Sequence, residues 1–429
     1  MSEVFRIEGG HRLDGRIRPS GNKNAALPLI CASVLSTETV QLENVPRIRD
    51  VIVLLELLEE LGVRVSWEGE VLELNARDLK ADVISAARAK KIRASILLAG
   101  PLLARRGRAE LPPPGGDAIG RRRLDTHVLA LEGLGAEVES SPERFVFRSE
   151  ERLQGADVFL DEASVTATEN ALMAASLAEG TTVLSNAASE PHVQDLCFLL
   201  QAMGCPIEGV GTNRLVIHGQ SSLHGALHRL GPDYIEVGSL IALAAVTGSE
   251  LWIEGARPEE HRATQIAFGR LGVEFRAEGE DLFVPGGQHL KVQPDLGGAI
   301  PKIEDAPWPG FPADLTSLAV VTATQAEGTV LIFEKLFESR LFFTDRLALM
   351  GARLILCDPH RVVVTGKARL FGSKMSSPDI RAGMALVIAA LCAEGQSTIQ
   401  NIQQVDRGYA RIDERLAALG ARIERRPGD

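Results

Sequence analysis

The sequence predicts an α/β fold built from six similar repeats of about 70 residues each. Three observations predict it: the length of the chain, a recurring helix end, and a switch from helical to strand periodicity inside each repeat. The chain has 429 residues, of which 45% are hydrophobic, and this length exceeds what one hydrophobic core usually organises. Two large domains or a series of repeated units are therefore expected, and the apolar content excludes intrinsic disorder.

A short motif that ends a helix and begins a strand recurs along the chain. It consists of Leu or Met, then Gly, then a small or apolar residue, and its glycines are Gly62, Gly135, Gly204, Gly272, Gly351 and Gly420. Upstream of three of these glycines stands a second echo, Ala-Glu-Gly, at residues 178–180, 326–328 and 393–395. Six repeats account for the chain.

The first repeat shows the order of the elements. Apolar residues at helical spacing predict a helix over residues 48–58, and they are Ile48, Val51, Ile52, Leu55 and Leu58. Gly62 can adopt the left-handed conformation that ends such a helix. Residues 63–67 then alternate with period two, which predicts a strand.

A second kind of helix precedes each Ala-Glu-Gly echo. Residues 170–177 and 382–391 are hydrophobic nearly all round, which is typical of a buried helix. Each repeat is thus expected to contain a strand, a buried helix, a strand, an outer amphipathic helix and closing strands. This order predicts helices inside and short sheets outside, rather than a doubly wound sheet. The motifs GxGxxG and GxxxxGK[ST] do not follow a predicted strand, so a dinucleotide site or a P-loop is not expected.

Composition and charge exclude several functional classes. The formal net charge of −11 argues against general nucleic-acid affinity. The longest apolar run, Met384 to Ala393, is too short for a membrane span, and the first residues lack a secretory signal, so a cytoplasmic protein is expected. The five cysteines are odd in number and widely spaced, which favours reduced core residues over disulfides. His224 and His228 stand beside no carboxylate cluster, so a protein-held metal is not expected.

Polar and charged residues interrupt the apolar segments where the six buried helices begin. These starts are residues 20–24, 90–95, 163–168, 231–236, 311–315 and 377–381. Helix N-termini carry unpaired N–H groups and a partial positive charge, so several converging ones would form an anion site. Ser, Asp and Pro at such places can be simple caps. Lys23, Arg93 and Arg381 are different, because the helix dipole disfavours cations in a first turn, and we interpret them as ligand contacts.

Five motifs carry a resemblance to a known family. They are residues 20–26 (SGNKNAA), 115–122 (GGDAIGRR), 311–314 (FPAD), 337–340 (FESR) and 406–409 (DRGY). In this order, and over essentially the whole chain, the sequence resembles the UDP-N-acetylglucosamine 1-carboxyvinyltransferases, enolpyruvyl transferases related to 5-enolpyruvylshikimate-3-phosphate synthase. The resemblance implies two similar inside-out α/β domains of three repeats each with a cleft between them. One would span residues 23–230, and the other residues 1–22 plus 231–429.

The resemblance also implies a reaction. The enolpyruvyl group of phosphoenolpyruvate is transferred to the 3-hydroxyl of UDP-N-acetylglucosamine and phosphate is released, in the first committed step of peptidoglycan synthesis, without a metal or redox cofactor. Guanidinium groups suit these anionic substrates through bidentate hydrogen bonds. By the family pattern Lys23, Arg122 and Arg407 would face the phosphate, Arg340 and Arg381 would hold the carboxylate, and Arg93 would line the same cleft. Asp314 matches the residue that takes the proton of the attacking hydroxyl, although its Pro-Ala-Asp setting also allows a helix cap.

Residues 111–123 are expected to form a surface loop, because Pro112 to Arg123 are too rich in Pro, Gly and Arg for a helix or strand. Taken alone, this segment could be a solvated basic turn. In the family it is a lid that closes over the nucleotide sugar and excludes water. Asp117 stands where most members carry a cysteine that protonates the enolpyruvyl methylene, and an aspartic acid can do so if burial raises its pKa. We therefore predict turnover without a thiol, and insensitivity to fosfomycin, which alkylates that cysteine.

Other positions depart from the family pattern, mostly on the acceptor side. Tyr234 replaces a usual arginine, Thr166 a glycine and Gln404 a histidine, Glu162 stands where some members have lysine, and the loop begins with an extra proline. Residues that still match nucleotide-sugar contacts are Asn24, Arg122, Leu124, Asp125, Ser164, Val165 and Phe337. A paralogue acting on another nucleotide or nucleotide sugar, a non-catalytic sensor and a repeat scaffold remain as alternatives. The polar helix starts differ from repeat to repeat, which favours an enzyme over a scaffold.

Overall fold

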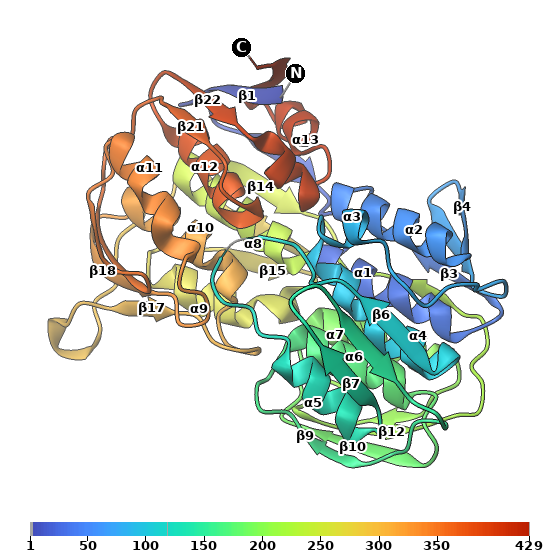
Figure 1. The fold of residues 1–429 in the computed structure, drawn as a ribbon. Helices are drawn as coiled ribbons and strands as arrows, with labels where there is room; N and C mark the ends of the chain where they lie inside the picture. Colours follow the sequence, from blue (N-terminus) through green and yellow to red (C-terminus); the bar gives the residue numbers. More distant parts are fainter. Residues whose placement is uncertain (1–2, 118, 429) are drawn as a thin grey trace. The chain divides into compact units, whose positions relative to one another are not determined.

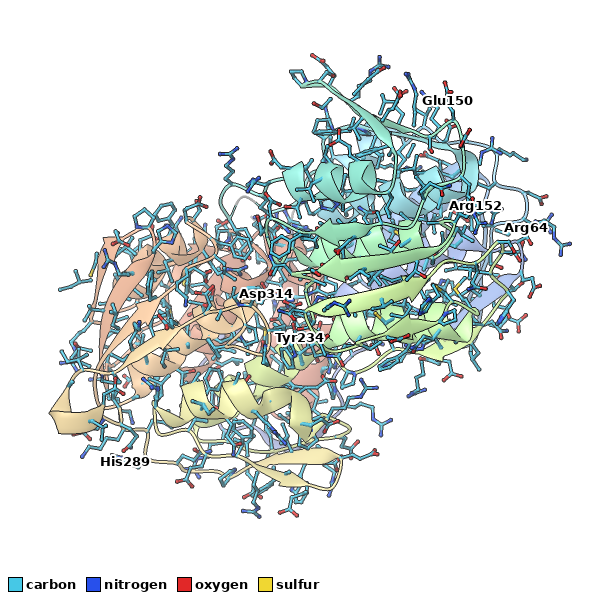
Figure 2. The ribbon with its side chains drawn as sticks, turned by 90° about the horizontal axis from the view of Figure 1, so that it is seen from below. Arg64, Glu150, Arg152, Tyr234, His289 and Asp314 are labelled. Carbon is cyan, nitrogen blue, oxygen red and sulfur yellow. The ribbon has the colours of Figure 1, made fainter. Side chains whose placement is uncertain are left out.

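The computed structural model describes residues 3–117 and 119–428, which form two compact units (Figure 1). The N-terminal unit comprises residues 21–117 and 122–231, and the C-terminal unit comprises residues 3–20, 119–121 and 232–428. Exposed charged side chains lie on the outside of each unit, for example those of Arg64 and His289 (Figure 2). None of the helices in the described ranges combines the length and the apolar character needed to cross a membrane.

Three inner helices form the core of the N-terminal unit. They are α1 (Lys23–Ala32), α4 (Ala99–Arg106) and α6 (Val165–Ala175), and the 3-10 helix η2 (Arg93–Leu98) leads into α4. α4 packs against α6, and α1 packs against η2. The helices outside this core are α2 (Arg49–Leu61), α3 (Ala86–Ala89), α5 (Asp125–Gly133) and α7 (Pro191–Ala202). The strands are β3 (Thr39–Glu43), β4 (Arg64–Glu68), β5 (Val71–Asn75), β6 (Arg108–Leu111), β7 (Glu137–Ser140), β8 (Phe145–Arg148), β9 (Asp157–Phe159), β10 (Thr181–Ser185), β11 (Ile207–Glu208), β12 (Arg214–His218) and β13 (Leu227–Arg229).

The C-terminal unit repeats this plan around α8 (Tyr234–Thr247), α10 (Thr316–Gln325) and α12 (Ile380–Cys392), which pack against one another. Its other helices are α9 (Arg262–Gly269), α11 (Thr344–Leu349) and α13 (Ile412–Ala418), with short 3-10 helices that include η5 (Ala313–Leu315), η6 (Arg340–Phe343) and η7 (Ile402–Arg407). The strands are β1 (Glu3–Glu8), β2 (Asp14–Ile17), β14 (Glu250–Ile253), β15 (Arg276–Glu278), β16 (Asp281–Val284), β17 (Lys302–Glu304), β18 (Gly328–Phe333), β19 (Leu354–Asp358), β20 (Arg361–Gly366), β21 (Lys374–Ser376), β22 (Gln396–Gln400) and β23 (Arg422–Pro427).

Six small sheets surround the inner helices in the described part of the chain, five with four strands and one with three. In three of the four-stranded sheets, the strand before an inner helix pairs in parallel with the strand after it: β9 with β10, β17 with β18, and β21 with β22. In the other two, the parallel partners are exchanged between α1 and α8, so that β2 before α1 pairs with β14 after α8, and β13 before α8 pairs with β3 after α1. Antiparallel strands complete the sheet. In the three-stranded sheet, a single parallel bridge between Val83 and Glu110 takes the place of the first strand. The repeat read in the sequence is therefore a repeat of topology.

Glycines let the sheets approach the ends of the inner helices. A Cβ at Gly219 would lie 2.0 Å from the carbonyl oxygen of Ala178, just after α6. A Cβ at Gly9 would lie 2.2 Å from the carbonyl oxygen of Ala393, just after α12. These separations exclude any side chain, so the same backbone contact closes a repeat in each unit.

The predicted α/β class, with helices inside and sheets outside, is confirmed. The helix predicted over residues 48–58 is α2, and Gly62 ends it with a φ of 98°. Ile52 was wrongly assigned to its buried stripe and is 49% exposed, because the buried face centres on Val51, Leu54 and Leu58. The prediction that the cysteines are core residues is wrong for Cys357, which is exposed on the edge strand β19.

Candidate active site

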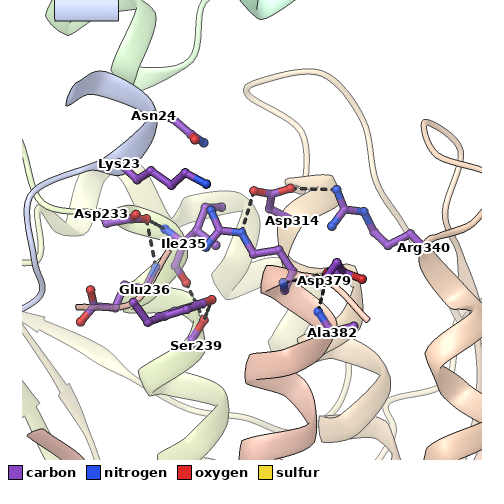
Figure 3. A network of polar contacts seen from close by, with 12 residues as sticks. Lys23, Asn24, Asp233, Ile235, Glu236, Ser239, Asp314, Arg340, Asp379 and Ala382 are labelled. Atoms are coloured by element: carbon purple, nitrogen blue, oxygen red, sulfur yellow. Dashed lines mark hydrogen bonds and ion pairs between the residues drawn. The ribbon is translucent and has the colours of Figure 1, made fainter. Parts of the chain in front are cut away.

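In the C-terminal unit, the carboxylate of Asp314 joins two arginines from different elements (Figure 3). Oδ1 of Asp314 accepts a hydrogen bond of 2.9 Å from Nη2 of Arg340, and Oδ2 accepts one of 2.8 Å from Nε of Arg381. Both arginines are buried, with 3% and 4% of their surface exposed, whereas Asp314 is half-buried. The two buried arginines are thus held by their hydrogen bonds to Asp314, and the carboxylate between them is partly exposed to solvent.

The position of Asp314 follows from the start of η5, of which it is the second residue. The N-cap position there is Pro312, so the interpretation of Asp314 as a helix cap is wrong. The aspartates that do cap inner helices in this unit are Asp233 for α8 and Asp379 for α12 (Figure 3). Asp314 is therefore placed for side-chain chemistry rather than for capping.

Arg340 lies over a buried glutamate. Nε of Arg340 is 3.6 Å from Oε2 of Glu334, which is fully buried, and the guanidinium carbon is 5.0 Å from the centroid of the Phe337 ring. Burial raises the pKa of Glu334 to about 8, although Arg340 partly offsets this. Burial lowers the pKa of Arg340, but Asp314 and Glu334 outweigh burial, so the net shift is upward. The guanidinium group stays charged.

Arg381 is the second residue of α12, a place that the helix dipole disfavours for a cation. Burial lowers its pKa, yet Asp314 and other neighbours leave the pKa well above its ordinary value. The guanidinium carbon lies 5.5 Å from the centroid of the Tyr409 ring. Its Nη1 is buried and has no hydrogen-bond partner among the described residues. Such a donor favours an anionic ligand, because an unpaired buried donor is costly.

Arg407 ends η7, and its Nη1 donates a hydrogen bond of 2.8 Å to Oε1 of Gln404. The preceding Asp406 accepts two hydrogen bonds, of 2.7 and 2.9 Å, from Arg425 of the last strand, β23. A Cβ at Gly408 would lie 3.7 Å from Nη1 of Arg381. The end of η7 therefore lies beside Arg381, which brings three of the predicted site arginines into one region of this unit.

The N-terminal unit carries its cations differently. Lys23 is the first residue of α1, and its Nζ lies 2.9 Å from Oδ2 of Asp50 in the first turn of α2. Both side chains are buried. Oδ1 of Asn22 caps α1 by accepting from the backbone N–H groups of Asn24 and Ala25. Lys23 is thus a cation held at a helix N-terminus by an acidic partner that the sequence pattern did not reveal.

Arg93, the first residue of η2, holds the C-terminal end of the predicted lid. Its Nη2 donates to the carbonyl oxygens of Arg122 and Arg123, at 3.0 and 3.2 Å. Burial, together with the positive charge of Arg122, lowers the pKa of Arg93 to about 10. Because burial and Arg122 destabilise the charged form of Arg93, a nearby anion would stabilise it.

Leu111, the first residue of the predicted loop, is the last residue of β6, so the loop begins one residue later than predicted. Residues 112–117 and 119–123 contain no helix or strand, and Ala118 lies outside the described residues. Asp117 is half-buried. Residues 119–121 group with the C-terminal unit, where the carbonyl oxygen of Ile119 accepts from the backbone N–H of Ser339 at 3.0 Å, and the carboxylate of Glu338 accepts from that of Arg121 at 3.2 Å.

Four predicted nucleotide-sugar contacts lie at the starts of α5 and α6, which pack against each other. Leu124 and Ser164 are the N-cap residues, and Asp125 and Val165 the first residues, of these two helices. Asp125 is exposed and accepts a hydrogen bond of 3.2 Å from Nε of Arg123. Oγ of Ser164 accepts from the backbone N–H of Ala167 at 3.4 Å.

Two residues that depart from the family pattern, Tyr234 and Thr166, contact named side chains. Tyr234 begins α8 and packs edge-on against Trp308, with 5.7 Å between the ring centroids. Thr166 is the second residue of α6, and its hydroxyl oxygen lies 3.0 Å from Nε2 of the buried His127. Glu162 is exposed.

Comparison with known proteins identifies the family. The family model of EPSP synthase (3-phosphoshikimate 1-carboxyvinyltransferase) matches residues 7–416. The chain belongs to this family. Its similarity is high to two proteins named UDP-N-acetylglucosamine 1-carboxyvinyltransferase, one from Bradyrhizobium diazoefficiens (60% identity, 98% of this chain and 97% of the relative) and one from Treponema denticola (58% identity, 97% and 98%). The resemblance read in the sequence and the prediction of a transferase are confirmed.

Solved structures show the same fold. The enolpyruvyl transferase NikO from Streptomyces tendae superposes with a TM-score of 0.87 at 24% identity and full coverage of both chains. EPSP synthase from Acinetobacter baumannii superposes with a TM-score of 0.74 at 19% identity, again with full coverage.

Three residues that hold predicted site residues in place were not predicted from the sequence: Asp50, Glu334 and Arg425. Glu334 carried one usable signal, because it directly follows the largely apolar strand segment 328–333. Asp50 and Arg425 carried none, since each reads locally as an ordinary charged residue of a surface helix or strand.

Proposed function

We propose that this protein transfers the enolpyruvyl group of phosphoenolpyruvate to the 3-hydroxyl of UDP-N-acetylglucosamine and releases phosphate, in the cytoplasm, as the first committed step of peptidoglycan synthesis. The observation that carries the proposal is the carboxylate of Asp314 held between Arg340 and Arg381. The names of relatives at 58–60% identity support this acceptor over another nucleotide sugar.

In this proposal the two arginines bind the carboxylate of phosphoenolpyruvate. Their guanidinium groups are buried and charged, and Nη1 of Arg381 is a buried donor without a hydrogen-bond partner among the described residues. A bidentate carboxylate would satisfy that donor. Lys23, Arg122 and Arg407 bind the phosphate. The acceptor is held by Asn24, Arg93, Leu124, Asp125, Ser164, Val165 and Phe337.

The reaction proceeds by addition and elimination. Asp314 takes the proton of the 3-hydroxyl as its oxygen forms a bond to C2 of phosphoenolpyruvate, and Asp117 gives a proton to the C3 methylene. The carboxylate of Asp117 then takes a proton back from C3 of the resulting tetrahedral intermediate, the bond from C2 to the phosphate oxygen breaks, and phosphate leaves. The fixed cations stabilise the charge on the departing phosphate, because they need no reorganisation as it develops.

The direct test is release of inorganic phosphate from phosphoenolpyruvate with and without UDP-N-acetylglucosamine. We expect release that depends on the acceptor and that is lost in Asp314→Ala. Binding of UDP-N-acetylglucosamine without release would indicate a sensor. Release only with a different nucleotide sugar would indicate a paralogue.

Fosfomycin tests the role of Asp117. The wild-type enzyme should turn over in the presence of the drug, whereas Asp117→Cys should turn over without the drug and lose activity with it. Loss of wild-type activity accompanied by a covalent adduct at any cysteine would contradict the assignment.

A further inference from the structure

A chain of three side chains in the N-terminal unit fixes the direction of a hydrogen bond at the start of α6. The residues are Asn170 and Thr166 of α6 and His127 of α5. Nδ2 of Asn170 lies 2.9 Å from Nδ1 of His127, and Nε2 of His127 lies 3.0 Å from Oγ1 of Thr166. Distances alone do not give the donors, but the surroundings of Asn170 do.

The amide of Asn170 has one allowed orientation. The backbone N–H of Gly100 can only donate, so the atom 2.8 Å from it is Oδ1 of Asn170. The backbone carbonyl of Ile96 can only accept, so the atom 2.8 Å from it is Nδ2. The remaining proton of Nδ2 points to Nδ1 of His127, which therefore accepts and carries no proton.

The ring of His127 then has its proton on Nε2. This ring is 1% exposed, and burial, with the positive charge of Arg93, lowers its pKa to about 3, so the ring is neutral. Nε2–H donates to Oγ1 of Thr166. The hydroxyl proton of Thr166 must therefore point away from His127, and among the described residues no acceptor for it is found.

We propose that Thr166 is a specificity residue that donates its hydroxyl proton to a phosphate oxygen of the nucleotide-sugar diphosphate. This rests on the function proposed above. Thr166 is half-buried in the first turn of α6, an 11-residue helix, where backbone N–H groups and the helix dipole favour an anion. Arg93, whose charge reaches His127, supplies a cation to the same region. His127 and Asn170 are positioning residues, because they act through Thr166.

Calorimetric binding of UDP-N-acetylglucosamine, UDP and uridine tests the proposal without turnover. Thr166→Val removes the hydroxyl at constant shape, and we expect Kd to rise about tenfold for both diphosphates and to stay unchanged for uridine. Thr166→Ser, which keeps the hydroxyl, should restore most of the affinity. Thr322→Val is the matched control, since Thr322 donates to its own helix in the C-terminal unit.

The outcomes separate this proposal from the proposed function. Wild-type protein that binds no UDP-N-acetylglucosamine would overturn both. Normal wild-type binding with unchanged Kd values in Thr166→Val would overturn only the role of Thr166. A loss confined to UDP-N-acetylglucosamine, with UDP unaffected, would place the contact on the sugar and overturn the phosphate assignment.

A second measurement needs no variant. Nitrogen-15 chemical shifts of the histidine rings in wild-type protein should show His127 as the neutral tautomer with its proton on Nε2. A proton on Nδ1 would mean that the hydrogen bonds from Asn170 through His127 to Thr166 run in the opposite direction, and it would overturn the proposal.

Discussion

Both units place cations at the starts of helices, but the groups around Arg340 and Arg381 differ from those around Arg93. In the C-terminal unit, Arg340 and Arg381 share the carboxylate of Asp314, and both keep a raised pKa. In the N-terminal unit, Arg93 donates to backbone carbonyls and has a pKa lowered to about 10. The same repeat architecture therefore supports two arrangements. In the C-terminal unit a carboxylate, Asp314, has two arginines as its counter-charges. In the N-terminal unit an arginine, Arg93, has a lowered pKa that a bound anion would raise.

The largest expected effect is the difference in activity between substitutions of Asp314 in the C-terminal unit and of Asp50 in the N-terminal unit. Asp314→Asn keeps the shape but removes the proposed base, so kcat should fall about 10²–10⁴-fold. Asp50→Asn removes the partner of Lys23 and should act mainly on KM for phosphoenolpyruvate. Steady-state phosphate release measures both. Equal losses of kcat in the two variants would mean that Asp314 serves only as an ion-pair partner.

The glycine contacts test whether the two units share one packing rule. Gly219→Ala and Gly9→Ala place a methyl group against the carbonyls that follow α6 and α12, and each should lower the free energy of unfolding by about 1–3 kcal/mol. Urea denaturation measures this. Gly269→Ala is the control, since no heavy atom lies within 4 Å of its Cβ position. A neutral effect at either contact glycine would show that its repeat is closed differently.

Arg425 offers a second test of how site cations are held. It binds Asp406, the residue before Arg407, whereas Asp50 binds Lys23 directly. Arg425 donates to Asp406 and Asp413, so Arg425→Leu should leave two acidic groups unpaired and cost about 2 kcal/mol of unfolding free energy. It should also raise KM for phosphoenolpyruvate, since Asp406 precedes Arg407. Arg425→Lys should recover part of the lost unfolding free energy and part of the affinity for phosphoenolpyruvate. An unchanged KM in Arg425→Leu would mean that β23 does not influence Arg407.

The smallest expected effect is on acid stability, through one buried histidine in each unit. Burial lowers the pKa of His127 to about 3 and that of His261 to about 4, from an ordinary 6.5. The unfolded chain therefore binds these protons first. Each contribution to stability is complete above pH 6.5 and is lost as the pH falls toward the folded-state pKa.

Urea unfolding at pH 6.5 and pH 5.5 checks this. Each histidine should account for about 1 kcal/mol of lost stability between these two pH values, because the unfolded-state imidazole is already half protonated at pH 6.5. His127→Gln and His261→Gln should each reduce the difference between the two pH values. His289→Gln, on the exposed surface (Figure 2), should leave it as in the wild type. An undiminished slope in His127→Gln would mean that His127 is charged in the folded protein.

The sequence by itself determined the repeat and the position of the cations. Helix ends such as Gly62 and the alternation of residues 63–67 are local consequences of backbone conformation and side-chain periodicity, so they can be read without a partner. A lysine or arginine at a helix start, as in Lys23 and Arg381, violates the dipole rule locally, and that violation predicted ligand contacts before any fold was known.

Only the tertiary structure decided what holds these residues. Asp50 beside Lys23, Glu334 beneath Arg340 and Asn170 behind His127 are set by the packing of separate helices and strands. Their charge and hydrogen-bond direction follow from burial and from which backbone groups face them, and neither quantity is encoded in local spacing. For the same reason, the donor role of Thr166 could be inferred only after the orientation of Asn170 was fixed by Gly100 and Ile96.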